Sequence, residues 1–184
     1  MLNRTTRMAC LCAWTLALAQ TTGLPKFEDY RSGQVFAGPR AAPRFTKQEL
    51  TSLDDARYRE ALERTTREGV NFAGRYVISQ WSCGTGCSSM AVANVMTGEV
   101  YRNMPYGTLD VQKGGGQYFE GAGFRPGSRL LILEGCFDVE ASSQSGKPLN
   151  CSRSFYTWEA PRFRLIKRIP YRMPAFYNYF YGKQ

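Results

Sequence analysis

Polar and apolar residues follow a helical spacing in one early segment of the chain. Thr46 and Glu49 have the separation of a capping box, in which each side chain accepts a hydrogen bond from the other residue's backbone N–H. Gly69 is the residue type that most often follows the end of a helix. The spacing predicts a helix that starts at Thr46 and stops at Gly69, with one face formed by Leu50, Leu53, Tyr58, Ala61, Leu62 and Thr65.

From Val70 onward the pattern is typical of β-strands. Three runs are rich in β-branched and aromatic residues, and Thr97-Gly98 supplies turn chemistry between the last two. We expect these runs to form an antiparallel meander, with a flexible glycine-rich loop over 105–117 after it. The three runs are 75–81, 89–96 and 99–103.

A similar order of features recurs in the second half, where strands are predicted at 129–133, 154–159 and 162–168. Each half contains strand, cysteine, loop, cysteine, strand, turn and strand, which suggests an approximate internal duplication. The sequence therefore predicts a mainly β fold of the α+β type. It consists of antiparallel meanders, with two similar halves packed as a sandwich or as blade-like sheets, and one N-terminal helix.

The first 45 residues divide into a leader and an arm. Residues 1–19 combine two arginines, an apolar stretch too short to span a membrane and a small-x-small triplet that ends at Ala19, which is the order of a cleavable signal peptide. Residues 20–45 are rich in Pro and Gly, which indicates an extended arm. We expect a periplasmic or secreted protein with one β-rich domain over 46–184 and no membrane span.

Cysteine usage agrees with export. Two of the six cysteines lie in the leader, and an even set remains for an oxidising compartment. Four thiols allow three pairings, and we favour the two local ones because each pair flanks a polar, Gly- or Ser-rich segment between strand-like runs. The favoured disulfides are Cys83 with Cys87 and Cys136 with Cys151.

Charge and the absence of histidine restrict the function. Loss of the leader leaves 22 Lys and Arg against 15 Asp and Glu, a net charge of +7, which favours an acidic partner. A chain without histidine lacks the Ser-His and Cys-His nucleophile systems and the commonest zinc ligand. We therefore assign no catalytic residue, no metal site and no cofactor, and export argues against nucleic acid as a partner.

The segment from Trp81 to Cys87 is the sharpest local feature of the sequence. Gly84, Thr85 and Gly86 separate the two cysteines, so the spacing is C-x3-C and differs from that of a C-x-x-C redox motif. A structural disulfide with glycines in a tight turn is the favoured interpretation. A redox-active dithiol and an anion-binding nest of backbone amides stay open as alternatives.

Part of the chain resembles small exported bacterial proteins of unknown function. The residues that carry the resemblance are Asn71-Phe72-Ala73-Gly74, Tyr76, Trp81, the Cys83–Cys87 segment and Thr97-Gly98-Glu99-Val100-Tyr101. The pattern covers about thirty residues closely and the later strands more loosely. The resemblance implies a periplasmic setting and a β-rich domain with a short helical lead-in, and it implies no activity.

These features favour a non-enzymatic interaction protein, such as an inhibitor or immunity-type protein for an envelope-acting toxin or hydrolase. Its partner is expected to be an acidic protein, contacted through the loops 84–86 and 137–150 and through Trp81. A thiol-disulfide protein that uses Cys83 and Cys87 is one alternative. A binder of anionic envelope polymers is the other. Partner identity and oligomeric state stay open at this point.

Overall fold

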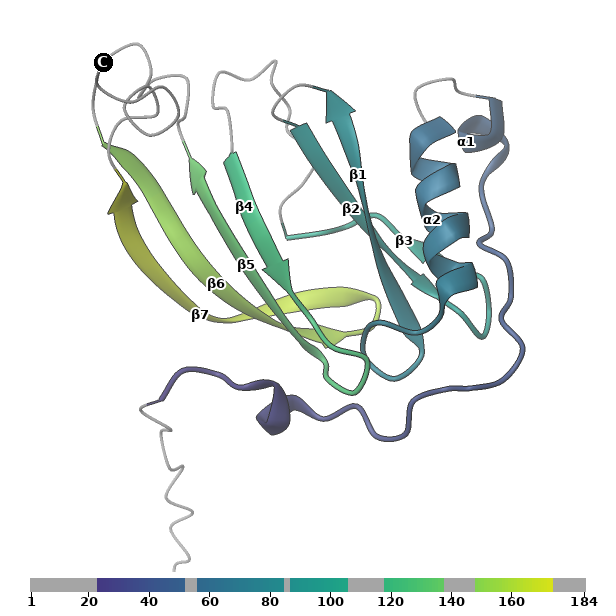
Figure 1. The fold of residues 1–184 in the computed structure, drawn as a ribbon, viewed down its shortest axis with the longest axis horizontal. Coiled ribbons are helices and arrows are strands. Elements are labelled where there is room, and N and C mark those ends of the chain that lie inside the picture. Colours follow the sequence, from purple (N-terminus) through teal and green to yellow (C-terminus); the bar gives the residue numbers. More distant parts are fainter. Residues whose placement is uncertain (1–22, 52–55, 85–86, 106–117, 138–147, 174–184) are drawn as a thin grey trace, which may run out of the picture.

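The computed structural model describes residues 23–51, 56–84, 87–105, 118–137 and 148–173. The helical elements precede seven strands, which form two antiparallel sheets (Figure 1). This arrangement confirms the prediction of a mainly β fold. The elements are η1 (Phe27–Tyr30), α1 (Lys47–Thr51), α2 (Ala56–Glu68), β1 (Tyr76–Gly84), β2 (Cys87–Asn94), β3 (Val100–Tyr101), β4 (Tyr118–Gly123), β5 (Leu130–Phe137), β6 (Leu149–Glu159) and β7 (Arg162–Met173).

The first sheet has the order β1-β2-β3, which is the meander that the sequence predicts. The second sheet has the order β4-β5-β6-β7 and contains the three predicted later strands. Its edge strand β4 was not predicted and has no counterpart in the first sheet. The β6–β7 hairpin turns at a cis Ala160–Pro161 peptide bond.

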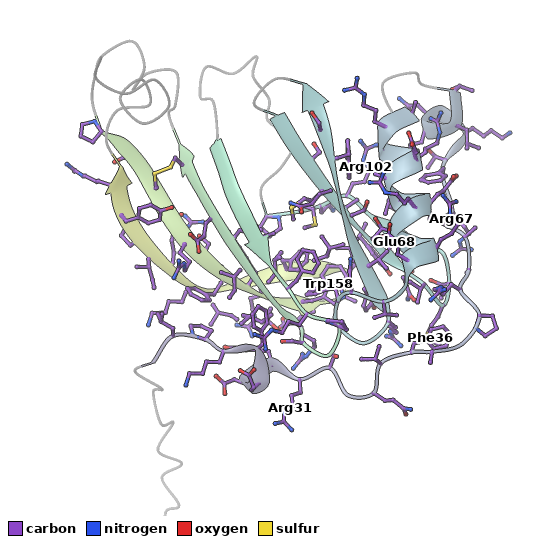
Figure 2. The ribbon with its side chains drawn as sticks, in the orientation of Figure 1. Arg31, Phe36, Arg67, Glu68, Arg102 and Trp158 are labelled. Carbon is purple, nitrogen blue, oxygen red and sulfur yellow. A yellow bond between two sulfur atoms is a disulfide. The ribbon has the colours of Figure 1, made fainter. Side chains whose placement is uncertain are left out.

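The main core lies between the two sheets. Alternate residues point to the same side of a strand, so Tyr76 and Ile78 of β1 face Leu131 and Leu133 of β5 across the interface. Trp158 of β6 lies between the sheets as well (Figure 2). Burial of these apolar surfaces on facing sides is what holds the two sheets together.

The opposite face of the first sheet is covered by α2. Tyr58 and Leu62 on the helix pack against Val77 of β1 and Ala91 of β2. The predicted capping box is present, because Thr46 N donates to the Glu49 carboxylate at 2.7 Å and Glu49 N donates to Thr46 Oγ1 at 3.3 Å. The molecule therefore has three layers, a helix and two sheets.

Leu50 departs from the predicted helix face. It lies in the short helix α1, which ends at Thr51, and its side chain is 56 % exposed. The predicted apolar face is confirmed at Tyr58, Ala61 and Leu62 of α2, all of which are buried. Among the described residues, no helix is long and apolar enough to cross a membrane.

Residues 23–45, which we call the strap, run along one end of both sheets (Figure 1). Tyr30 O accepts a hydrogen bond from Arg129 N at 2.7 Å beside the second sheet. Farther along, Arg44 N donates to Gly98 O at 2.7 Å in the turn before β3. Apart from η1, the strap has no helix or strand. It is bound to the folded domain through its backbone.

The disulfide predicted between Cys136 and Cys151 is present. The two residues lie opposite each other on β5 and β6, so the bond links neighbouring strands of the second sheet. The bridge closes a segment with a sequence separation of 15. The other predicted bridge stays a prediction, because the Cys83 and Cys87 side chains lie outside the described part of the structure.

Candidate functional site

Of the residues predicted to form an interaction loop, the structure describes Trp81 and Gly84, and both belong to β1. Gly84 is the last residue of β1, at the tip of the β1–β2 hairpin, whereas Thr85 and Gly86 lie outside the described residues. Trp81 is half-buried and points toward α2, where its ring lies 5.1 Å from that of Tyr58. The described part of this hairpin therefore places Trp81 against the helix. Most of the second predicted loop, 137–150, also lies outside the described residues.

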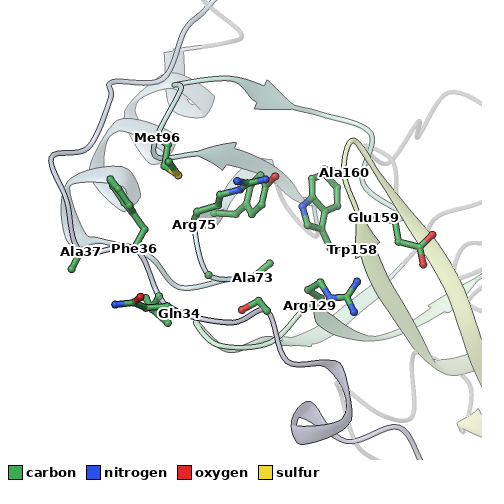
Figure 3. Close-up of a pocket in the computed structure, with 14 residues that line it drawn as sticks. Gln34, Phe36, Ala37, Ala73, Arg75, Met96, Arg129, Trp158, Glu159 and Ala160 are labelled. Carbon is green, nitrogen blue, oxygen red and sulfur yellow. The ribbon is translucent and has the colours of Figure 1, made fainter.

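A different site is found where the strap crosses the sheets. A cavity of about 690 Å³ opens there between the strap, the start of β1 and the β6–β7 turn (Figure 3). Its walls include polar, aromatic and cationic side chains. The lining residues include Ser32, Phe36, Arg75, Met96, Arg129 and Trp158.

The strap wall is fixed by a close approach of two backbone segments. Phe36 N donates to Gly74 O at 2.7 Å, and Gly74 N donates to Pro126 O at 2.7 Å. Gly74 has φ +77°, and a Cβ there would lie only 3.1 Å from Ser32 Oγ. The glycine is therefore needed both for the left-handed backbone conformation and for contact with the strap.

Two arginines on the cavity wall have no acidic partner among the described residues. Arg75 lies over the Tyr76 ring, with its guanidinium carbon 5.6 Å from the ring centroid. Arg129 lies on the other side of Ala73, beside Trp158 (Figure 3). Neither guanidinium group has a carboxylate within 4.0 Å in the described part of the chain. The site therefore has an excess of positive charge.

Among the described residues, Glu159 supplies the only carboxylate that lines the cavity, and it is paired with Arg164. Arg164 holds it with an ion pair of 2.7 Å and a hydrogen bond from Nε at 2.8 Å. That hydrogen bond, and to a lesser extent the charges of Arg164 and Arg129, hold the pKa of Glu159 below its ordinary value. Glu159 is therefore ionised at neutral pH, and its own partner is Arg164.

Trp158 forms the inner wall of the cavity. It is only 3 % exposed, and its ring is surrounded by those of Phe163, Tyr76 and Tyr101 at centroid distances of 4.7, 5.4 and 5.4 Å. These contacts hold the indole ring in one position. Its Nε1–H group has no hydrogen-bond partner among the described residues, and the same is true of the Ser32 hydroxyl. Buried polar atoms without partners are rare in folded proteins, and both of these belong to residues that line the cavity.

A neighbouring tyrosine has an altered acidity that follows from its position. Burial and a hydrogen bond of 2.7 Å to Glu99 raise the pKa of Tyr101 well above its ordinary value. Tyr101 is therefore a neutral hydrogen-bond donor at any physiological pH and packs against Trp158 as an uncharged ring.

The described residues that line the cavity are suited to binding a ligand. The cavity combines cationic groups, neutral donors and apolar surface, which is the composition of a ligand-binding pocket. In the described part of the chain, no group of three or more His, Cys, Asp or Glu is arranged to hold a metal ion. The arrangement can bind and orient an anionic group.

The cavity is not apparent from the sequence, because its walls come from segments far apart in the chain. The only local signal is that Arg75 and Arg129 each directly precede a strand. Strands β1 and β5 both begin at the end of the sandwich where the strap crosses, which brings the two arginines to one site. No protein-family model, curated protein or solved structure matches the chain.

Proposed function

We propose that this chain is a non-enzymatic exported binding protein that recognises an acidic protein partner. The cavity beside the strap supports this proposal, because Arg75 and Arg129 line it without a carboxylate partner among the described residues. The leader-like residues 1–19 and the disulfide between β5 and β6 support an exported setting. An inhibitor or immunity-type role toward an envelope-acting toxin or hydrolase is the specific form that we propose.

The distribution of charge favours an acidic partner. The edge strand β7 carries five basic residues within twelve positions and no acidic residue. Arg164 is paired with Glu159, and the other four basic residues leave the strand with a net positive charge, which attracts an oppositely charged protein and increases its association rate at low salt. The five basic residues are Arg162, Arg164, Lys167, Arg168 and Arg172.

The proposal is tested by co-purification, followed by binding measurements with the purified partner. The mature protein is immobilised and exposed to periplasmic extract, and any captured protein is purified and titrated calorimetrically against the parent and an Arg75→Gln/Arg129→Gln variant. We expect a partner with an acidic isoelectric point, micromolar or tighter binding, and at least tenfold weaker binding by the variant, about 1.4 kcal/mol. Recovery of no protein that binds the purified chain at micromolar concentration would contradict the proposal.

The basic strand β7 also favours a second candidate, binding of an anionic envelope polymer. Such binding depends on many weak charge contacts, so it weakens steeply as salt rises. Replacement of Arg162 and Arg172 by Gln is expected to weaken binding to a soluble polyanion such as polygalacturonate. An unchanged affinity in that variant, or the same affinity at high salt, argues against the polymer.

A further inference from the structure

The cavity beside the strap carries a more specific inference, which rests on the proposed function. We propose that it binds an organic carboxylate, with the anionic group at Arg75 and Arg129 and the apolar body of the ligand against Phe36 and Met96. In a protein partner, this ligand is a carboxylate next to an apolar side chain. A free organic acid has the same chemistry.

The charge of the ligand follows from the polar groups that the cavity offers. The charged side chains that line this cavity without a carboxylate within 4.0 Å are Arg75 and Arg129, whose guanidinium groups are donors only, and the Gln34 amide adds both a donor and an acceptor. The Glu159 carboxylate is paired with Arg164 at 2.7 Å through Oε1, which offsets its negative charge. A ligand that complements the two cavity guanidinium groups brings acceptors and negative charge.

The apolar half of the site indicates that the anion is attached to an organic body. Met96 is 49 % exposed and Val35 is 38 % exposed, and both line the cavity near Phe36. Large apolar side chains exposed next to cationic groups match a ligand with one apolar and one charged end. An inorganic anion would leave this part of the cavity without a contact.

The packing of Trp158 argues against a neutral sugar. Carbohydrate sites stack a ring of the ligand on an exposed aromatic face, but the Trp158 ring is 3 % exposed and is packed by Phe163, Tyr76 and Tyr101. Tyr76 is buried and has Arg75 over its ring. These rings therefore act as a rigid support that positions Arg75.

Trp158 also provides a reporter for the experiment. The three tryptophans are Trp14, Trp81 and Trp158, and Trp14 lies in the leader-like segment. In a chain from residue 20 that carries Trp81→Phe, Trp158 is the only tryptophan. Its fluorescence then reports on the cavity alone.

The test titrates this single-tryptophan protein with matched acid and amide pairs. The probes are 3-phenylpropionate with 3-phenylpropanamide, and acetyl-Ala-Phe as the free acid and as the C-terminal amide, so that a free organic acid and a peptide end are compared. We expect each acid to bind at least tenfold more tightly than its amide. Arg75→Gln should weaken acid binding at least tenfold, and Arg57→Gln, which removes an exposed cation on α2 outside the cavity, should leave it within twofold.

Three results would overturn the inference. They are equal binding of acid and amide, binding of the acids that Arg75→Gln does not change, and displacement of the acids by equimolar inorganic phosphate. The proposed function can fail separately. If the acids bind as expected but no protein partner is captured, the proposed function falls and the carboxylate site stands. If the acids do not bind but a captured protein partner binds the parent at least tenfold more tightly than the Arg75→Gln/Arg129→Gln variant, the reverse holds.

Discussion

Replacement of Gly98 tests whether the strap is held in place by close backbone packing. Gly98 has φ +73°, and a Cβ built there would overlap the carbonyl oxygen of Ala42 in the strap. Because the obstructing atom belongs to the backbone, no side-chain rotation can relieve the overlap. In Gly98→Ala the strap must therefore move away from the turn before β3.

The magnitude can be worked out from a matched control. Gly33 also has a positive φ, +84°, but a Cβ there meets nothing within 4 Å, so Gly33→Ala measures the backbone cost alone, about 1 kcal/mol. Gly98→Ala adds the loss of two strap hydrogen bonds, from Arg44 N to Gly98 O and from Ala41 N to Val95 O, at about 1 kcal/mol each. We expect destabilisation of about 3 kcal/mol against about 1 kcal/mol in the control.

Urea unfolding of the two variants and the parent gives these free energies. Limited trypsin digestion gives a second readout, because Arg40 and Arg44 lie in the strap and should be cleaved faster in Gly98→Ala than in Gly33→Ala. If the two substitutions lower the free energy of unfolding by the same amount, to within about 0.5 kcal/mol, the reasoning is refuted. That margin is the usual deviation when free-energy changes at independent sites are compared.

Three further predictions concern the cross-link, one carboxylate and the core. Replacing both Cys136 and Cys151 by Ser should destabilise the chain by about 3 kcal/mol in urea unfolding, and reductant should produce a similar loss in the parent. Burial raises the pKa of Glu49, but hydrogen bonds with Thr46 and Tyr58 and the charge of Arg102 together lower it below 4.5. The stability that Glu49 contributes is therefore complete above pH 4.5 and is lost as pH falls through its lower pKa in the folded state, and Glu49→Gln should flatten this part of a pH series of unfolding measurements. Phe72→Ala should cost about 3–5 kcal/mol, because the ring is fully buried between the sheets, and a loss below about 1 kcal/mol would contradict this packing.

Elements with strong local signals could be predicted from the sequence. The capping box at Thr46 and Glu49 needs only residues three apart, and the meander β1-β2-β3 is marked by β-branched runs and the Thr97-Gly98 turn. Strand β4 lacks such a signal, because it contains Gly121 and Gly123, which favour strands poorly. It is held in the sheet by its pairing with β5.

The candidate site could not be predicted, because it depends on contacts between distant segments. The sequence indicates that residues 20–45 are extended, but it does not indicate that Phe36 N bonds to Gly74 O. Without that bond there is no wall on one side of the cavity. Gly74 indicates a close contact with the strap only when the position of the strap is already known. From the sequence alone, a glycine there fits an ordinary turn equally well.

Arg75 and Arg129 line the cavity beside the strap and, like several other described arginines such as Arg57 and Arg172, have no carboxylate within 4.0 Å in the described part of the chain. Four arginines of the described residues lie within 3.3 Å of a carboxylate, in the pairs Arg102–Glu49, Arg125–Glu28, Arg153–Glu134 and Arg164–Glu159. Arg75 and Arg129 line one cavity without such a partner, although two like charges near each other cost free energy. If these arginines served stability, Arg75→Gln would destabilise the fold. If they serve binding, the substitution should leave the free energy of unfolding unchanged or raise it slightly at low salt while it weakens ligand binding, because residues that recognise a partner are commonly retained at the expense of stability. Opposite signs for stability and affinity in this single variant therefore distinguish a binding site from a structural one.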